Sequence, residues 1–184
     1  MEFKGLRINI ILLAIIVVIL VFFTVNHLLK IYNIERPLQD RLKSFTEIKD
    51  FLLINSNGKI DLQITFRPDI DFYHLYQEID QIAAEHLGSK KGKIIVKNTD
   101  SKQLDQVYYQ LQYALFEGMA TSQFVTMEKN ISRIVKANQL ADYKLWIDHQ
   151  ALFLQLDDGK SSLYQRIPYH KSLTLNQAGG GSNG

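Results

Sequence analysis

The sequence contains no cysteine, which excludes disulfide bonds, thiolate zinc sites and a cysteine nucleophile. The histidines do not indicate a metal site either, because they lack the His-x-x-x-His or His-Glu-x-x-His spacing that brings two ligands to one helix face. They are His27, His74, His86, His149 and His170. Local sequence patterns therefore predict no metal site, no cofactor and no catalytic residue set.

A long run of basic residues is also lacking. The formal net charge is +2, and the densest basic cluster, Lys90, Lys91 and Lys93, leads into a predicted strand. Nucleic-acid surfaces usually carry a stripe of lysine and arginine side chains. The charge pattern therefore predicts no nucleic-acid partner.

Charge is absent altogether from residues 8–25 (INIILLAIIVVILVFFTV), where only Asn9 and Thr24 are polar. At about 1.5 Å per residue, a helix of this length covers most of a hydrocarbon core roughly 30 Å thick. We predict one transmembrane helix over residues 8–29, and hence a single-pass protein of the plasma membrane.

The predicted helix is expected to remain as an uncleaved signal anchor. Cleaved signal peptides have an apolar core of about 7 to 15 residues and a small-residue cleavage site, and the run here is longer and lacks that site. Positive residues after the run outnumber Lys4 and Arg7 before it, which favours a cytoplasmic domain. A short basic head directly before an apolar helix favours the opposite orientation, so we expect the domain to lie outside the cytoplasm.

The residues Lys4, Gly5 and Leu6 before the apolar run resemble the processing site of type IV pilin-like proteins, in which cleavage follows the glycine. That family has a glutamate five residues into the mature chain, where this sequence has Ile10. A pilin-like component is therefore an alternative, and an ordinary anchor is the favoured interpretation.

The remaining sequence predicts an α+β fold with one small mixed domain. The expected parts are a basic tail (1–7), the anchor (8–29), a juxtamembrane helical segment (30–50), the α+β domain (51–169) and a flexible glycine-rich tail (170–184). In the juxtamembrane segment, apolar residues recur from Leu38 to Ile48 at the spacing of one helix face. This face either meets the membrane or another copy, or, as we favour, packs on its own domain.

The domain is expected to begin with a β-hairpin. Asn57-Gly58 supplies the two positive-φ residues of a tight turn. Counting outward from this turn pairs Asn55 with Ile60, and two further apolar pairs follow on the same face. The hairpin is therefore expected to pack its apolar face on helices.

A helix from Phe72 to Leu87 is predicted next, because its apolar residues recur at helical spacing. Asp69 or Asp71 is expected to cap this helix, since the further oxygen ligands of a calcium loop are missing. Residues 93–97 predict a strand that completes a parallel strand–helix–strand unit with the second hairpin strand.

Residues 102–138 predict two packed helices that break around Gly118 to Ser122. Three apolar segments then predict an antiparallel meander; they are residues 143–148, 151–156 and 162–167. Asp148 and His149 lie next to each other near a strand end, so they are expected to point to opposite faces rather than to act as an acid–base pair.

The function favoured by the sequence is a non-enzymatic interaction or assembly module of the cell envelope, with a protein partner or a homo-oligomeric state. One alternative is a membrane-tethered sensor or carrier that binds a small apolar or aromatic ligand. Its pocket would be lined by Tyr108, Tyr113, Phe124 and Trp146. A less favoured alternative is a membrane-bound hydrolase, which would require Glu117, Asp148 and His170 to converge.

Overall fold

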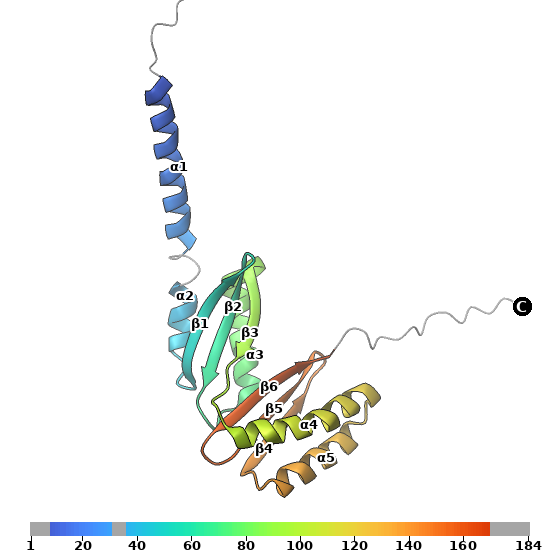
Figure 1. The fold of residues 1–184 in the computed structure, drawn as a ribbon. Coiled ribbons are helices and arrows are strands. Elements are labelled where there is room, and N and C mark those ends of the chain that lie inside the picture. The colour runs from blue at the N-terminus through green and yellow to red at the C-terminus, as the bar shows by residue number, and fades with distance from the viewer. Residues whose placement is uncertain (1–7, 31–35, 170–184) are drawn as a thin grey trace, which may run out of the picture.

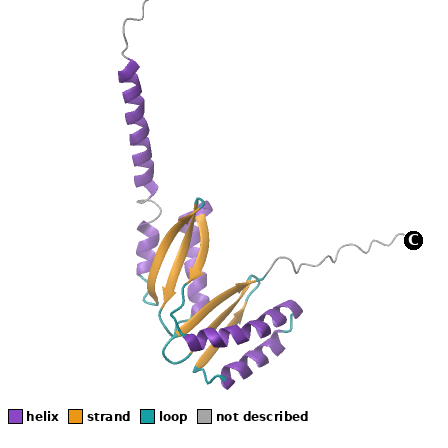
Figure 2. Ribbon diagram, viewed as in Figure 1, coloured by secondary structure: helices purple, strands orange, loops and turns teal. Residues whose placement is uncertain are grey.

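The computed structural model describes residues 8–30 and 36–169 (Figure 1). The helices are α1 (Ile8–Lys30), α2 (Arg36–Lys43), α3 (Phe72–Leu87), the short 3-10 helix η2 (Gly88–Lys90), α4 (Lys102–Thr121) and α5 (Phe124–Ala137). The strands are β1 (Ile48–Ser56), β2 (Lys59–Phe66), β3 (Lys91–Val96), β4 (Asp142–Ile147), β5 (Ala151–Asp157) and β6 (Ser162–Pro168). Figure 2 shows helices beside two small sheets, and the predicted α+β class is confirmed.

Three predicted segments fall partly or wholly outside the described residues. They are the basic tail (1–7), residues 31–35 of the juxtamembrane segment and the glycine-rich tail (170–184). The prediction that His170 belongs to a hydrolase site falls there as well.

The first sheet has the strand order β1-β2-β3 and follows the predicted topology. Asn57 and Gly58 take positive φ values of 50° and 78°, so they form the tight turn of the β1–β2 hairpin. Asn55 pairs with Ile60 and the register continues outward as predicted. β3 runs parallel to β2, and α3 connects the two strands as the predicted strand–helix–strand unit requires.

Helix α2 packs on the domain rather than standing free. Leu38 and Leu42 are fully buried in the core that the first sheet forms with α3. The predicted helix face was too long, because α2 ends at Lys43 and Ile48 begins β1, where it pairs with Phe66. The apolar spacing in this segment fits both a helix and a strand, and pairing with β2 decides in favour of the strand.

Helices α4 and α5 form the predicted pair, and the break falls at Ser122, which takes the left-handed conformation (φ 55°). Gly118 lies inside α4 rather than at the break. A Cβ atom added at Gly118 would lie 2.5 Å from Met127 Cβ of α5, which is too close for real atoms. Gly118 therefore allows the two helices to approach closely.

The second sheet, of strand order β4-β5-β6, is the predicted antiparallel meander and forms a layer shared by two cores. Side chains of β5 alternate between them: Phe153 packs with the first sheet and α3, whereas Leu152 and Leu154 pack with α4 and α5. Because both faces are covered, residues 151–156 are all buried.

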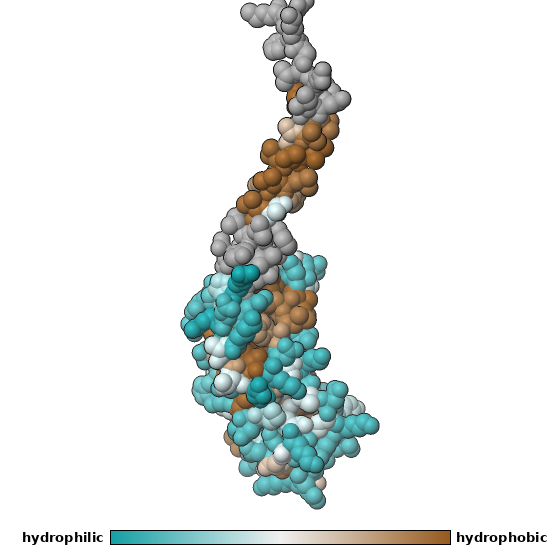
Figure 3. All heavy atoms as spheres, turned by 90° about the vertical axis from the view of Figure 1, so that its left-hand side faces the viewer, coloured by the Kyte–Doolittle hydropathy of each residue, from teal (hydrophilic) through white to brown (hydrophobic). Residues whose placement is uncertain are grey.

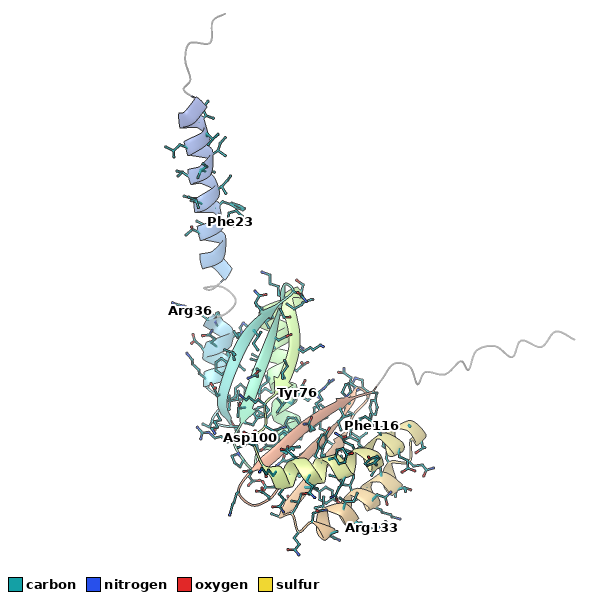
Figure 4. The ribbon with its side chains drawn as sticks, viewed as in Figure 1. Phe23, Arg36, Tyr76, Asp100, Phe116 and Arg133 are labelled. Carbon is teal, nitrogen blue, oxygen red and sulfur yellow. The ribbon has the colours of Figure 1, made fainter. Side chains whose placement is uncertain are left out.

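An aromatic cluster joins the first sheet and α3 to the second sheet. Phe72 of α3 is fully buried, and its ring centroid lies 5.9 Å from Phe66 of β2, 5.8 Å from Phe153 of β5 and 5.1 Å from Tyr164 of β6. Tyr76 completes the cluster and is labelled between α3 and the second sheet in Figure 4. Aromatic pairs at these separations stabilise packing beyond their buried area.

Helix α1 lies apart from the folded domain (Figure 1), and Phe23 projects from the side of this helix (Figure 4). The side chains of residues 11–25 are all exposed. Among the helices of the described residues, none combines the length and the apolarity that crossing a bilayer requires. The transmembrane helix over residues 8–29 therefore stays a prediction.

Candidate functional site

A cleft of the domain lies on the face of the second sheet that packs toward α3. One end of this face is polar, because Asp142 lies opposite Asp157 and Lys144 lies opposite Gln155. The other end is aromatic, because Trp146 lies opposite Phe153. The cleft has a volume of about 410 Å³. It is lined by Pro68, Asp69, Asp142, Tyr143, Lys144, Gln155, Asp157, Gly159 and Lys160.

One wall of the cleft is the segment that leads from β2 into α3. Asp69 takes a positive φ of 54°, and its backbone N–H donates a hydrogen bond to Ser162 Oγ at 3.3 Å. The Ser162 hydroxyl in turn donates to Asp157 Oδ2 at 2.6 Å. Tyr164 fixes the same segment, since its hydroxyl donates to the Arg67 carbonyl oxygen at 2.8 Å. These bonds tie the wall to the floor of the cleft.

The opposite wall is the turn between β5 and β6, which its own aspartates hold in shape. Asp157 Oδ1 accepts from the Gly159 N–H at 2.6 Å, and Asp158 Oδ1 accepts from the Ser161 N–H at 2.7 Å. Burial alone would raise the pKa of Asp158, but hydrogen bonds from Ser161, Lys160 and Ser101 outweigh it and lower the pKa below its usual value. Asp158 is therefore ionised at neutral pH and stabilises this turn.

Gln155 is the unusual residue of the floor. Its side chain is only 2% exposed, and its Oε1 atom accepts no hydrogen bond from any of the residues that the structure describes. Leaving a buried acceptor unpaired costs about 1–3 kcal/mol, so such groups are rare in folded proteins.

The charges around Gln155 are mixed. Three carboxylates line the cleft together with the ammonium groups of Lys144 and Lys160. Lys144 Nζ lies 3.8 Å from Asp69 Oδ1, which is a loose and largely exposed ion pair. Over the described parts of the chain, no three or more histidine, cysteine or acidic side chains are grouped closely enough to hold a metal ion. The cleft therefore offers hydrogen-bond donors and acceptors side by side.

The aromatic pocket expected from the sequence is not assembled from its four residues. Trp146 lies on the α3 side of the second sheet, where it stacks on Tyr73. Tyr108 and Phe124 pack in the other core, on the opposite face of that sheet, and Tyr113 is 70% exposed on α4. The sequence placed these residues on the correct elements but could not assign them to faces.

Of the three residues of the hydrolase alternative, the structure describes Glu117 and Asp148, and these two lie on different elements. Asp148 accepts hydrogen bonds from the Gln150 and Ala151 N–H groups at the β4–β5 turn. Glu117 lies on α4, beside a small cleft between α4 and α5. Asp148 thus has a structural role in the turn.

Of the two aspartates considered as helix caps, Asp71 takes that role. Its side chain accepts from the His74 N–H at 3.3 Å. Asp69 instead lines the cleft, and the sequence analysis also missed Gln155. One signal pointed to Gln155, since it is the single polar residue within the apolar run of residues 151–156.

Comparison of the chain with models of protein families, with curated proteins and with solved structures finds no match.

Proposed function

We propose that this chain is a single-pass, membrane-anchored and non-enzymatic protein of the cell envelope, whose α+β domain lies outside the cytoplasm and acts as an interaction or assembly module. The observation that carries the proposal is the apolar surface of α1. Every side chain from Ile11 to Val25 is exposed, and Thr24 alone among them is polar. Figure 3 shows this helix as a continuous hydrophobic column above a mainly hydrophilic domain.

A helix on the surface of a water-soluble domain normally has one apolar stripe, whereas a helix that is apolar all round requires burial in lipid or protein. The uncharged run of the sequence begins before the described side chains, at Ile8, so no charged residue interrupts the apolar surface of α1 as far as Val25. Lipid is the simplest surrounding that covers all sides of one helix.

The interaction role is supported by an aromatic stripe on α4. Tyr109, Tyr113 and Phe116 are 60%, 70% and 50% exposed, and their spacing of four and three residues places them on one helix face. Figure 4 labels Phe116 on this helix, which lies at the end of the domain far from α1. Tyrosine and phenylalanine are enriched at protein interfaces, so this stripe fits a protein partner or a second copy of the chain.

Cell fractionation tests the anchor. The full chain should sediment with membranes, resist extraction by high salt and alkali, and dissolve in detergent. A variant with Ile15→Lys and Ile19→Lys should move to the soluble fraction, because a charged residue near the bilayer centre costs about 3 kcal/mol. The matched control, Leu52→Lys, changes a residue that is 55% exposed on β1 and should leave the chain in the membrane. A wild-type chain recovered in the membrane-free fraction would contradict the proposal.

A second candidate function, a membrane-tethered sensor or carrier of a small ligand, is favoured by one observation. The cleft on the second sheet has a volume of about 410 Å³ and is lined by charged side chains of both signs, including Asp142, Asp157 and Lys144. Its lining is polar, so the ligand expected from the structure is polar rather than apolar or aromatic.

A further inference from the structure

We propose that the aromatic stripe of α4 is a homodimer interface, in which α4 of a second copy of this chain packs antiparallel against it. The stripe consists of the exposed side chains of Tyr109, Tyr113 and Phe116. This inference rests on the interaction role proposed above and names the partner. It does not depend on the membrane anchor.

The first step concerns the rigidity of the stripe. The opposite face of α4 is buried in the core that it forms with α5 and the second sheet, through residues such as Leu104, Leu111 and Leu115. Tyr109 and Tyr113 also hold each other, because their hydroxyl oxygens lie 3.3 Å apart and their rings meet edge to face with centroids 6.0 Å apart. Side chains that are already ordered lose little conformational entropy on binding, which favours association.

The second step concerns symmetry. In a two-fold dimer both copies use the same surface, so a residue and its contact exchange places across the axis. We place the axis level with Leu111, midway between the two tyrosines. Tyr109 of each copy then lies opposite Tyr113 of the other, and the tyrosine rings of both copies meet at the centre. A single stripe therefore supplies both halves of an aromatic contact.

The third step concerns the charged residues near the two ends of the stripe. Lys102 and Glu117 are exposed, and neither side chain forms an ion pair within the parts of the chain that the structure describes. An antiparallel arrangement brings Lys102 of each copy near Glu117 of the other, so opposite charges meet at both ends of the interface. Successive residues turn by about 100°, so Lys102 lies about 60° around the helix from Glu117 and Asp105 lies about 120° from it. The two acidic residues are therefore kept on different flanks.

Other occupants and arrangements fit the stripe less well. A parallel pair would place Lys102 beside its own counterpart and Glu117 beside its own counterpart, and it would align the two helix dipoles side by side. A nucleic acid would require a basic surface, whereas Lys102 is the only basic residue of α4 and is outnumbered by Asp105 and Glu117.

Sedimentation equilibrium of the full chain tests the proposal, in a detergent whose density is matched by the solvent. We expect a monomer–dimer equilibrium. Tyr109→Ala combined with Tyr113→Ala should weaken the dimer about tenfold or more, because aromatic anchors carry much of the binding energy of an interface. The matched control, Leu52→Ala combined with Ile95→Ala, removes two exposed apolar side chains from the first sheet and should leave the dissociation constant unchanged.

A second set of variants keeps the test valid if the tyrosine variant does not fold. Lys102→Glu and Glu117→Lys change only exposed charges, and each alone should weaken the dimer about threefold or more because like charges then meet. Combined in one chain they should restore the wild-type affinity, since the ion pair forms again with its signs exchanged. Lys129→Glu, at an exposed position of α5, is the control and should have no effect.

Disulfide cross-linking tests the antiparallel register, because the chain has no cysteine of its own. Lys102 and Ala120 are exposed and lie equally far from Leu111 on its two sides, so a mixture of Lys102→Cys and Ala120→Cys chains should form a disulfide-linked dimer. Either variant alone should form none. The two copies of one cysteine would lie about 27 Å apart along the helix pair, whereas a disulfide requires Cα atoms within about 7 Å.

Four results would overturn the dimer. They are a chain that stays monomeric, a dimer that the two tyrosine replacements leave unchanged, a charge exchange that does not restore the affinity, and single-cysteine chains that cross-link with themselves. A monomeric chain would leave the interaction role to a partner of different sequence, so the two proposals fail separately. None of these results bears on the anchor, which fractionation tests.

Discussion

At the scale of single residues, Asn98 connects the end of the first sheet to the second sheet by hydrogen bonds. It follows β3, and its side chain bonds both backbone polar groups of Tyr164 on β6. Asn98 Nδ2 donates to the Tyr164 carbonyl oxygen at 3.1 Å, and Asn98 Oδ1 accepts from the Tyr164 N–H at 2.8 Å. The side chain thus takes the place of a neighbouring strand at this edge of the second sheet.

Replacing Asn98 by alanine should therefore destabilise the whole domain. Two part-buried backbone groups would lose their partners, and we expect a loss of about 1–3 kcal/mol in the free energy of unfolding. Urea unfolding followed by circular dichroism measures it. Asn55→Ala, at an exposed position of β1, is the control and should change stability by less than about 0.5 kcal/mol. Equal stability of the two variants would contradict the role given to Asn98.

Tyr76 makes stability sensitive to alkali. Burial raises the pKa of its hydroxyl from 10.0 to about 12, despite the opposing charge of Arg166. Because the pKa is higher in the folded than in the unfolded state, the contribution of the protonated Tyr76 hydroxyl to the free energy of unfolding is fully present below pH 10. It is lost as the pH rises through about 12. Tyr76→Phe should remove this dependence, so its stability should fall less than that of the wild type between these pH values. Unfolding midpoints measured across this range check it, and parallel pH profiles for the two proteins would contradict it.

At the scale of helices and strands, the α4–α5 pair depends on the absence of a side chain at Gly118. Glycine to alanine inside an open helix normally stabilises by about 1 kcal/mol. Here the added Cβ would lie 2.5 Å from Met127 Cβ, and overpacking of this kind costs about 1–3 kcal/mol, so the clash should outweigh the gain. Gly118→Ala should therefore lower the unfolding midpoint.

The control for Gly118→Ala is Gln106→Ala, at an exposed position of the same helix. It should leave stability unchanged or slightly higher, because alanine favours helix. A Gly118→Ala protein that melts above the wild type would show that α5 can move away from α4 at little cost.

Most elements could be predicted because their signals are local. Asn57-Gly58 sets the hairpin register by turn geometry, and the turn residues between β4, β5 and β6 set the meander. Ile48 was misassigned because its spacing from Leu42 and Phe45 fits a helix, whereas its pairing with Phe66 depends on a residue 18 positions away. Local patterns contain no information about such a partner.

The cleft could not be predicted for a related reason. Gln155 lies on the same face of β5 as Phe153, which packs with α3, and Asp69 lines the same cleft from a different part of the chain. The polar residue in an apolar strand was visible in the sequence, but its unpaired oxygen and its charged neighbours depend on tertiary packing.

At the scale of the whole molecule, β5 makes the two cores interdependent. Phe153 is 1% exposed and contacts Phe72, Tyr73 and Tyr76 of α3, while its neighbours in the strand support α4 and α5. The domain should therefore unfold in one transition, although it contains two separate sheets.

Phe153→Ala tests this coupling. Removing a fully buried phenylalanine should cost about 3–5 kcal/mol. Both cores should lose protection together when amide hydrogen exchange is followed residue by residue in β2 and α5. Val125→Ala is the control, because Val125 is 71% exposed and should have little effect. Loss of protection confined to β2 and α3 would show that the cores unfold independently.

The same junction contains the protein's single tryptophan. Trp146 stacks on Tyr73 across the boundary, with ring centroids 6.2 Å apart and planes 17° from parallel. Its fluorescence emission therefore reports on one place only, where α3 meets the second sheet. A red shift that precedes the loss of helical signal on heating would reveal the two halves parting, and a simultaneous change would show that they separate only as they melt.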